Sequence, residues 1–186
     1  EWIVQAVYNI SGKAEFNAPG NLYSKTVQLE IAANEVYQIE LSETIKPGRR
    51  NIEPTNNELV KYVEIESKLL SKFWGKPMKI RASILIPRNF QKNQDKKYPV
   101  RINIGGYGSS WTRASRLEND KSFRNWWLSD DAPEILNIFP DGDGPYGDPY
   151  YVDSENNGPY GKALTEELIP FIEKEYMGLG LSIIHI

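Results

Sequence analysis

The sequence of 186 residues contains no cysteine and a single histidine, His185. Without cysteine the chain can form no disulfide, no thiolate metal site and no thiol nucleophile. It also lacks any apolar run near the ~20 residues of a membrane-spanning helix, so we expect no membrane segment. The net charge is -3 and the basic residues are not clustered, so nucleic acid is not an expected partner.

The remaining composition is that of a globular protein with one substantial core, at 40% hydrophobic and 25% charged residues. The 5 Trp and 11 Tyr residues are many for this length. Several of them fall in loops, where they either form a surface for a carbohydrate or aromatic ligand or serve as core and lid residues.

The first 48 residues have the alternation and β-branched content of short strands. Strands are predicted at residues 2–8, 26–31 and 35–41, with a turn at residues 18–21. Proline, glycine and asparagine then mark a linker near residues 46–57. We therefore expect a small β-rich amino-terminal extension over residues 1–48.

The rest of the chain, residues 58–186, predicts an α/β domain. Alternating apolar residues indicate two antiparallel lead-in strands at 62–69 and 78–86, joined by a tight aromatic connection at 73–77. Strands at 100–104, 135–139 and 181–186 then alternate with helices at 114–128 and 162–176, a pattern typical of a parallel sheet. Pro170 should bend the second helix, because proline removes a hydrogen bond from a helix interior.

Two loops follow strands of this expected parallel sheet, and open α/β sheets bind ligands at the carboxyl ends of their strands. The first is Gly105-Gly106-Tyr107-Gly108-Ser109-Ser110. It lacks the spacing of either nucleotide-binding motif, so an oxyanion loop and a plain turn are its main alternatives. The second runs from residue 141 to 160, is dense in Gly, Asp, Asn and Tyr, and ends in a helix-start signal at Asn157-Gly158-Pro159.

Five acidic residues of the second loop, Asp141, Asp143, Asp148, Asp153 and Glu155, suggest calcium. Pro145 and Tyr146 nevertheless stand where a calcium loop of the EF-hand type needs a ligand and a glycine. Turn carboxylates exposed to solvent are therefore the preferred reading. A glycosidase pair ranks lower, since sequence cannot give the distance between two carboxylates.

Neither His185 nor the nearby Ser182 predicts catalysis. His185 stands next to the end of an apolar strand and is interpreted as structural. The segment Gly180-Leu181-Ser182 has half of a nucleophile elbow, but it lacks the closing glycine and lies at the start of a strand instead of after one.

Four sequence blocks together resemble bacterial esterases of the α/β-hydrolase superfamily, the group related to esterase D and feruloyl esterases. They are residues 19–24, residues 67–78, Tyr98-Pro99-Val100 with the glycines that follow, and residues 143–161. The segment Glu167-Leu168-Ile169-Pro170 also looks like that family's helix before the nucleophile strand. The resemblance covers nearly the whole chain as far as Tyr176.

The resemblance implies a partial α/β-hydrolase sheet from a secreted or periplasmic serine esterase. It implies that Gly106 and Tyr107 belong to the oxyanion loop. It also implies that five residues line a wall beside the substrate: Asp143, Tyr146, Asn156, Asn157 and Tyr160. In the family the nucleophile elbow, acid and histidine come after the strand at which this sequence stops.

No catalytic residue therefore carries over, and we expect no metal or cofactor and an inactive chain. The full-length enzyme would act on a small-molecule or carbohydrate-linked ester. An uncovered sheet edge and an uncovered face of helix 162–176 would favour self-association. The competing hypothesis is a non-enzymatic module that binds carbohydrate or calcium.

Overall fold

The computed structural model describes residues 1–11, 16–46, 54–90 and 95–185. The chain divides into two units, one of residues 1–53 with 145–147 and one of residues 54–144 with 148–186. Most of the predicted linker, residues 47–53, lies outside the described residues, as does Ile186. In the described part of the chain, no helix combines the length and hydropathy that crossing a bilayer requires.

The first unit contains five short strands. They are β1 (Trp2–Val4), β2 (Val7–Tyr8), β3 (Leu22–Tyr23), β4 (Val27–Leu29) and β5 (Glu43–Thr44). Strand β1 pairs with β4, and β2, β3 and β5 form a second antiparallel sheet. The predicted turn is present, with Gly20 at φ 91°. The buried Asn21 fixes the neighbouring loop, because its Oδ1 accepts hydrogen bonds from the backbone N–H groups of Ile10 and Ser11.

The strand predicted at residues 35–41 is wrong, since that segment has no regular structure. Its Tyr37 hydroxyl instead donates to the carbonyl of Glu30 and accepts from the N–H of Ala32. Side-chain bonds of this kind hold a loop and compete with strand pairing.

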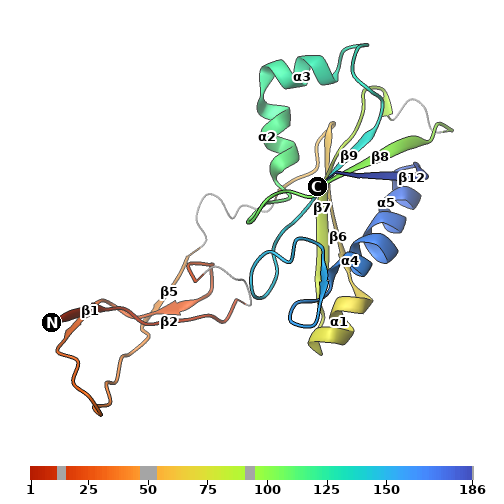
Figure 1. Cartoon of the computed structure of the whole chain (residues 1–186). Helices are drawn as coiled ribbons and strands as arrows, with labels where there is room; N and C mark the ends of the chain where they lie inside the picture. The colour runs from red at the N-terminus through yellow and green to blue at the C-terminus, as the bar shows by residue number, and fades with distance from the viewer. Residues whose placement is uncertain (12–15, 47–53, 91–94, 186) are drawn as a thin grey trace. The chain divides into compact units, whose positions relative to one another are not determined.

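The second unit is built on a sheet of five strands. They are β6 (Val60–Glu66), β7 (Lys79–Leu85), β8 (Tyr98–Asn103), β9 (Leu136–Pro140) and β12 (Gly178–His185). Their order across the sheet is β12-β8-β9-β7-β6. Strand β7 is antiparallel to both β6 and β9, whereas β8 is parallel to both β9 and β12 (Figure 1). The predicted antiparallel lead-in followed by three parallel strands is confirmed.

Helices cover both faces of this sheet. They are α1 (Lys68–Trp74), α2 (Arg113–Asn119), α3 (Lys121–Trp127), α4 (Tyr160–Lys162), the π-helix η3 (Ala163–Leu168) and α5 (Ile169–Glu175). Figure 1 shows α2 and α3 on one side and α1, α4 and α5 on the other. A small hairpin of β10 (Asp153–Ser154) and β11 (Gly158–Pro159) precedes α4.

Alternation along the central strands divides the core between the two faces. Ile84 and Ile138 pack in the cluster that includes residues of α1, η3 and α5, whereas their neighbours Leu85 and Phe139 pack with Ala114 and Trp127 of the α2–α3 side. Because both faces are covered, β9 is a nearly continuous apolar run that only the buried Asn137 interrupts.

The predicted strand 62–69 is too long, because β6 ends at Glu66 and a helix begins directly after it. Ser67 caps α1 by accepting the N–H of Leu70 at 3.1 Å. Glu167 of η3 accepts the Ser67 hydroxyl and, at 3.0 Å, the N–H of Leu69. The predicted tight connection at 73–77 is therefore the end of this helix, which stops at Gly75 with φ 65°.

The two predicted long helices are each interrupted. Asp120 separates α2 from α3 and caps α3, accepting the N–H groups of Ser122 and Phe123. The second helix begins at Tyr160 and continues through the π-helix η3 into α5, where Pro170 lies in the first turn. The bend expected at Pro170 stays a prediction.

The expectation of an uncovered apolar face on helix 162–176 is wrong. Leu164, Leu168 and Ile172 are buried in the core against the sheet. Strand β12 does lie at the edge of the sheet. Self-association through that edge stays a prediction.

Candidate functional site

The loops that follow β8 and β9 leave the same edge of the sheet, because the two strands are parallel. Three hydrogen bonds join them. Gly142 N–H donates to the Ser109 carbonyl at 2.9 Å, Gly108 N–H to Asp148 Oδ2 at 3.1 Å, and Trp111 N–H to Asp141 Oδ1 at 3.2 Å. The predicted proximity of these two loops is therefore confirmed.

The first loop makes a tight turn that leaves two neighbouring amides open. Ser109 N–H donates to the Gly106 carbonyl at 2.9 Å, and Gly108 has φ 70°. Within the described residues, the backbone N–H groups of Gly106 and Tyr107 have no hydrogen-bond acceptor. Gly106 is exposed, and a Cβ placed on it would meet nothing within 4 Å. Two adjacent donors of this kind can bind an anion or a developing oxyanion.

Asp148 joins the second loop to this turn, although the sequence suggested it only as a possible calcium ligand. Its Oδ2 accepts the Gly108 N–H and its Oδ1 accepts the Tyr150 N–H at 2.8 Å. A Cβ on Gly142 would lie 2.3 Å from Asp148 Oδ2, so the glycine permits this close approach. Asp148-Pro149-Tyr150 is an Asx-turn sequence, and that signal could have revealed the residue.

A partly buried ion pair lies beneath the two loops. Arg81 Nε contacts Asp141 Oδ2 at 2.5 Å, and Arg81 Nη2 contacts Asp143 Oδ2 at 3.0 Å. The guanidinium carbon also lies 4.8 Å from the centroid of the Trp111 ring. Burial raises the pKa of Asp141 above its ordinary value, while Arg81 and the Trp111 N–H favour the charged form. Arg81 lies in the interior of strand β7, and nothing in the sequence linked it to Asp141.

Tyrosines of the second loop occupy an unusual backbone conformation. Tyr150 and Tyr151 have φ values of 51° and 53°, a region that costs a residue with a Cβ roughly 1–2 kcal/mol. The buried Tyr151 donates its hydroxyl to the Asp141 carbonyl at 2.8 Å. The Tyr150 ring instead lies 6.3 Å from the ring of Tyr107, centroid to centroid.

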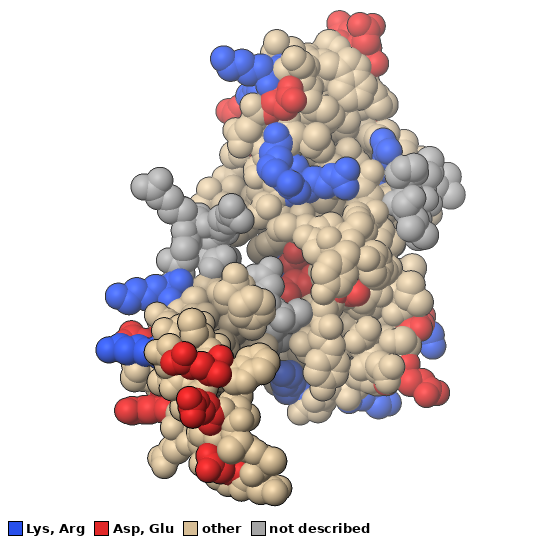
Figure 2. Space-filling model, turned by 60° about the vertical axis from the view of Figure 1, so that its left-hand side comes forward, with Lys and Arg blue, Asp and Glu red and all other residues tan. Residues whose placement is uncertain are grey.

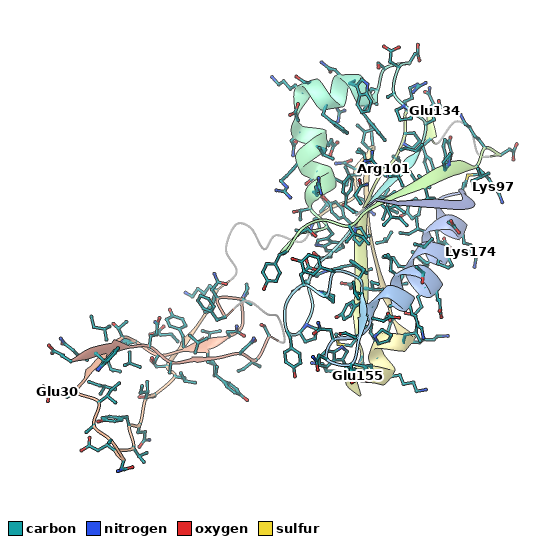
Figure 3. The ribbon with its side chains drawn as sticks, viewed as in Figure 1. Glu30, Lys97, Arg101, Glu134, Glu155 and Lys174 are labelled. Carbon is teal, nitrogen blue, oxygen red and sulfur yellow. The ribbon has the colours of Figure 1, made fainter. Side chains whose placement is uncertain are left out.

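The five predicted wall residues are dispersed. Asp143 is paired with Arg81, and Tyr160 is buried in the core with its ring against Tyr151. Asn156 and Asn157 lie in the turn of the β10–β11 hairpin, beside α1, where Figure 3 labels Glu155. Tyr146 belongs to the first unit with residues 145–147. Their role as a wall beside the substrate stays a prediction.

Four of the five acidic residues of the second loop serve as hydrogen-bond acceptors for the fold. Asp141 and Asp143 bind Arg81, Asp148 binds two amides, and Asp153 accepts the N–H of Lys162 at the start of the helix. Among the residues that the structure describes, no group of three or more acidic or histidine side chains could hold a metal ion. Figure 2 shows Lys and Arg side chains in small groups separated by uncharged surface.

The backbone of His185 lies at the carboxyl end of β12, opposite Asn103 in the strand register. Asn103 in turn donates to Asn137 on the neighbouring strand β9. His185 thus lies at the carboxyl ends of the parallel strands, where the first loop also leaves the sheet.

Comparison with known proteins finds similarity among solved structures. No protein-family model and no curated protein sequence matches the chain. A solved structure named a ferulic acid esterase superimposes with a TM-score of 0.51 at 22% sequence identity. The match covers 69% of this chain and 49% of that one, so the chain spans about half of its length. The similarity shows that the two proteins share a fold.

Strongly alkaline solution should unfold the second unit. Burial, and next the charge of Asp143, raise the pKa of Tyr160 to about 12, and burial raises that of Tyr151 well above its ordinary value. A tyrosine whose pKa is higher in the folded state than in the unfolded state contributes to the unfolding free energy. The contribution is complete below the unfolded-state pKa of about 10 and is lost as the pH rises through the folded-state pKa. Tyr160 alone should account for about 2–3 kcal/mol. Urea unfolding followed by circular dichroism from about pH 9 to 12 measures this.

The matched control for this effect is Tyr160→Phe, which removes the ionisable group and keeps the ring. Its unfolding free energy should fall less steeply over the same pH range, because one tyrosine fewer ionises on unfolding. An identical slope in both proteins would contradict the assignment to Tyr160.

Proposed function

We propose that this chain is the amino-terminal portion of a serine carboxylic-ester hydrolase and supplies the oxyanion side of its site. In the complete enzyme a serine oxygen attacks the ester carbonyl, and the N–H groups of Gly106 and Tyr107 donate to the oxygen that becomes negative. The alcohol then leaves with a proton from a general acid, and water releases the acid from the acyl-serine. The substrate is a small-molecule or carbohydrate-linked ester.

The observation that carries this proposal is the pair of open amides at the carboxyl edge of β8. An oxyanion donor must be positioned before substrate arrives, so that no free energy is spent on reorganisation during the reaction. The hydrogen bond between Asp148 and Gly108 holds the turn in this arrangement without using either donor.

The order of strands in the sheet supports the same proposal. In the sheet the antiparallel strand β7 lies between β6 and β9, and the parallel strands β8 and β12 follow beyond β9. A protein named a ferulic acid esterase shares this fold. By the sequence resemblance, η3 and α5 correspond to the helix that precedes the nucleophile strand, and β12 is the strand that follows them. Location outside the cytoplasm also comes from that resemblance and stays a prediction.

We further propose that the 186 residues alone hydrolyse no ester. Two serines lie in the candidate oxyanion loop, but Ser110 Oγ contacts the Thr112 hydroxyl at 3.1 Å and not a base. No observation favours the alternative of a non-enzymatic carbohydrate- or calcium-binding module, and four of the five acidic side chains are used by the fold itself.

Hydrolysis of a simple aryl ester tests the proposal. The 186-residue chain should show only background turnover, whereas the longer product of its gene should be active and should lose activity when its elbow serine is changed to alanine. In the longer protein, Tyr107→Pro removes one donor and should reduce kcat about 10²- to 10³-fold. Tyr107→Ala retains the N–H and is the control.

Two results would oppose this assignment. Turnover by the 186-residue chain that survives both Ser109→Ala and Ser110→Ala would place the chemistry on other residues. Equal kcat values for Tyr107→Pro and Tyr107→Ala would remove the amide from the mechanism.

A further inference from the structure

The guanidinium group of Arg113 lies at the first loop without a carboxylate partner. Arg81, Arg88 and Arg124 each form an ion pair. Within the described residues, by contrast, the exposed side chain of Arg113 forms neither an ion pair nor a hydrogen bond. Its guanidinium carbon lies 5.6 Å from the centroid of the buried Phe139 ring. This contact supports the cation and leaves its N–H groups available to a ligand.

Gly105 brings this cation next to the open amides. A Cβ on Gly105 would lie 3.6 Å from Arg113 Nη1 and 2.7 Å from Ser109 Oγ, so the guanidinium and the hydroxyl occupy the space beside this glycine. Gly105 directly precedes Gly106, and consecutive Cα atoms are only about 3.8 Å apart. The guanidinium therefore lies at the part of the loop from which the N–H groups of Gly106 and Tyr107 are open.

Charge decides what these donors bind. Asp148 carries a negative charge on the other side of the turn, where its Oδ2 accepts the Gly108 N–H. That charge repels an anion at the open amides, and the opposite charge of Arg113 offsets the repulsion. Arginine pairs with carboxylates through its planar fork of N–H groups, in bonds that are stronger than those between neutral groups. A carboxylate has one oxygen for the amides and a second for the guanidinium.

We propose that Arg113 and the N–H groups of Gly106 and Tyr107 form a carboxylate-binding site, in which the amides bind one oxygen and the guanidinium binds the other. The role of the site rests on the proposed esterase function. Hydrolysis of an ester releases an acid that is ionised near neutral pH. Arg113 holds this product where it forms and thereby makes the reaction sensitive to inhibition by the released carboxylate.

Binding to the 186-residue chain tests the site without any turnover. Sodium acetate, sodium chloride and acetamide are titrated separately, and the amide resonances of Gly106 and Tyr107 and the Nε–H resonance of Arg113 are followed by NMR. We expect acetate to shift all three resonances until they saturate. Acetamide has a similar shape without the charge, and chloride has no second oxygen for the guanidinium, so both should bind more weakly.

Three variants connect the binding to this arginine. Arg113→Gln should weaken acetate binding roughly three- to tenfold, between the ranges for an exposed ion pair and for a hydrogen bond to a charged group. Arg113→Lys retains the charge without the planar fork and should lie between the two. Arg116→Gln is the matched control. It removes an exposed arginine one helical turn farther along α2, and its effect should be less than about twofold because solvent screens that charge.

The inference is overturned if acetate leaves the resonances unshifted, or if chloride or acetamide binds as tightly as acetate. It is also overturned if Arg113→Gln binds acetate normally or if Arg116→Gln weakens binding equally. It fails separately from the proposed function. Acetate binding that depends on Arg113, in a protein whose full-length form hydrolyses no ester, would support the site and oppose the esterase. Hydrolysis that acetate inhibits equally in the unchanged enzyme and in Arg113→Gln would support the esterase and overturn the site.

Discussion

Arg81→Met should lower the unfolding free energy of the second unit by about 3–5 kcal/mol near neutral pH, the usual loss when one partner of a buried ion pair is removed. The substitution leaves the carboxylate of Asp141 buried without its guanidinium partner. The stack of Arg81 on Trp111 is lost as well. Urea unfolding at two pH values measures the effect.

Acid should rescue this variant. Without Arg81 the folded-state pKa of Asp141 rises further above its unfolded-state pKa of about 3.9. The destabilisation caused by the unpaired carboxylate is therefore absent at pH values below the unfolded-state pKa, and it grows as the pH rises through the folded-state pKa. The control is Lys79→Met in the same strand, whose pair with Glu64 lies at the surface and should contribute less than about 1 kcal/mol. A loss for Arg81→Met that is equal at pH 4 and pH 7 would rule out the buried charge as its cause.

Gly158→Ala should also be strongly destabilising, by roughly 2–5 kcal/mol. Gly158 has φ 92°, and a Cβ there would lie 2.8 Å from Cδ1 of Phe73 in α1. Positive φ contributes about 1–2 kcal/mol and overpacking about 1–3 kcal/mol. Thermal and urea unfolding of the variant provide the measurement.

The two contributions can be separated. Gly75→Ala is the control for conformation alone, because Gly75 has φ 65° with nothing within 4 Å of its missing Cβ, and it should cost only the first contribution. Combining Gly158→Ala with Phe73→Ala should relieve the contact, so the double variant should lose less than the sum of the two single losses. Strict additivity would show that the ring is not the obstacle.

The arrangement of the sheet could be predicted because its signal is local. Strand β9 is buried on both faces and therefore appears in the sequence as an apolar run, whereas β6 and β7 appear as alternating apolar residues. The proximity of the two site loops followed from the parallel direction of β8 and β9 alone. Neither inference required knowledge of a side-chain contact.

The parts that could not be predicted depend on residues far apart in the sequence. Arg81 and Asp141 are 60 positions apart, so a strand arginine and a loop aspartate gave no indication of each other. The wall residues were selected as polar or aromatic members of one loop, but its backbone turns Tyr160 into the core and Tyr150 outward. The start of α1 was misread as strand because the alternation of Val63 and Ile65 appeared to continue past Ser67.

The bond between Glu167 and the start of α1 also has a consequence for biosynthesis. Glu167 follows Ser67 by 100 positions, so at about 5–20 residues per second roughly 5–20 s separate their synthesis on the ribosome. During that interval α1 has only its own serine cap. The amino-terminal strands β6 and β7 can pair meanwhile, but the face that α4, η3 and α5 cover stays open to solvent. Nascent chains that end before Glu167 therefore expose apolar surface, and this interval is when chaperones would have most reason to bind.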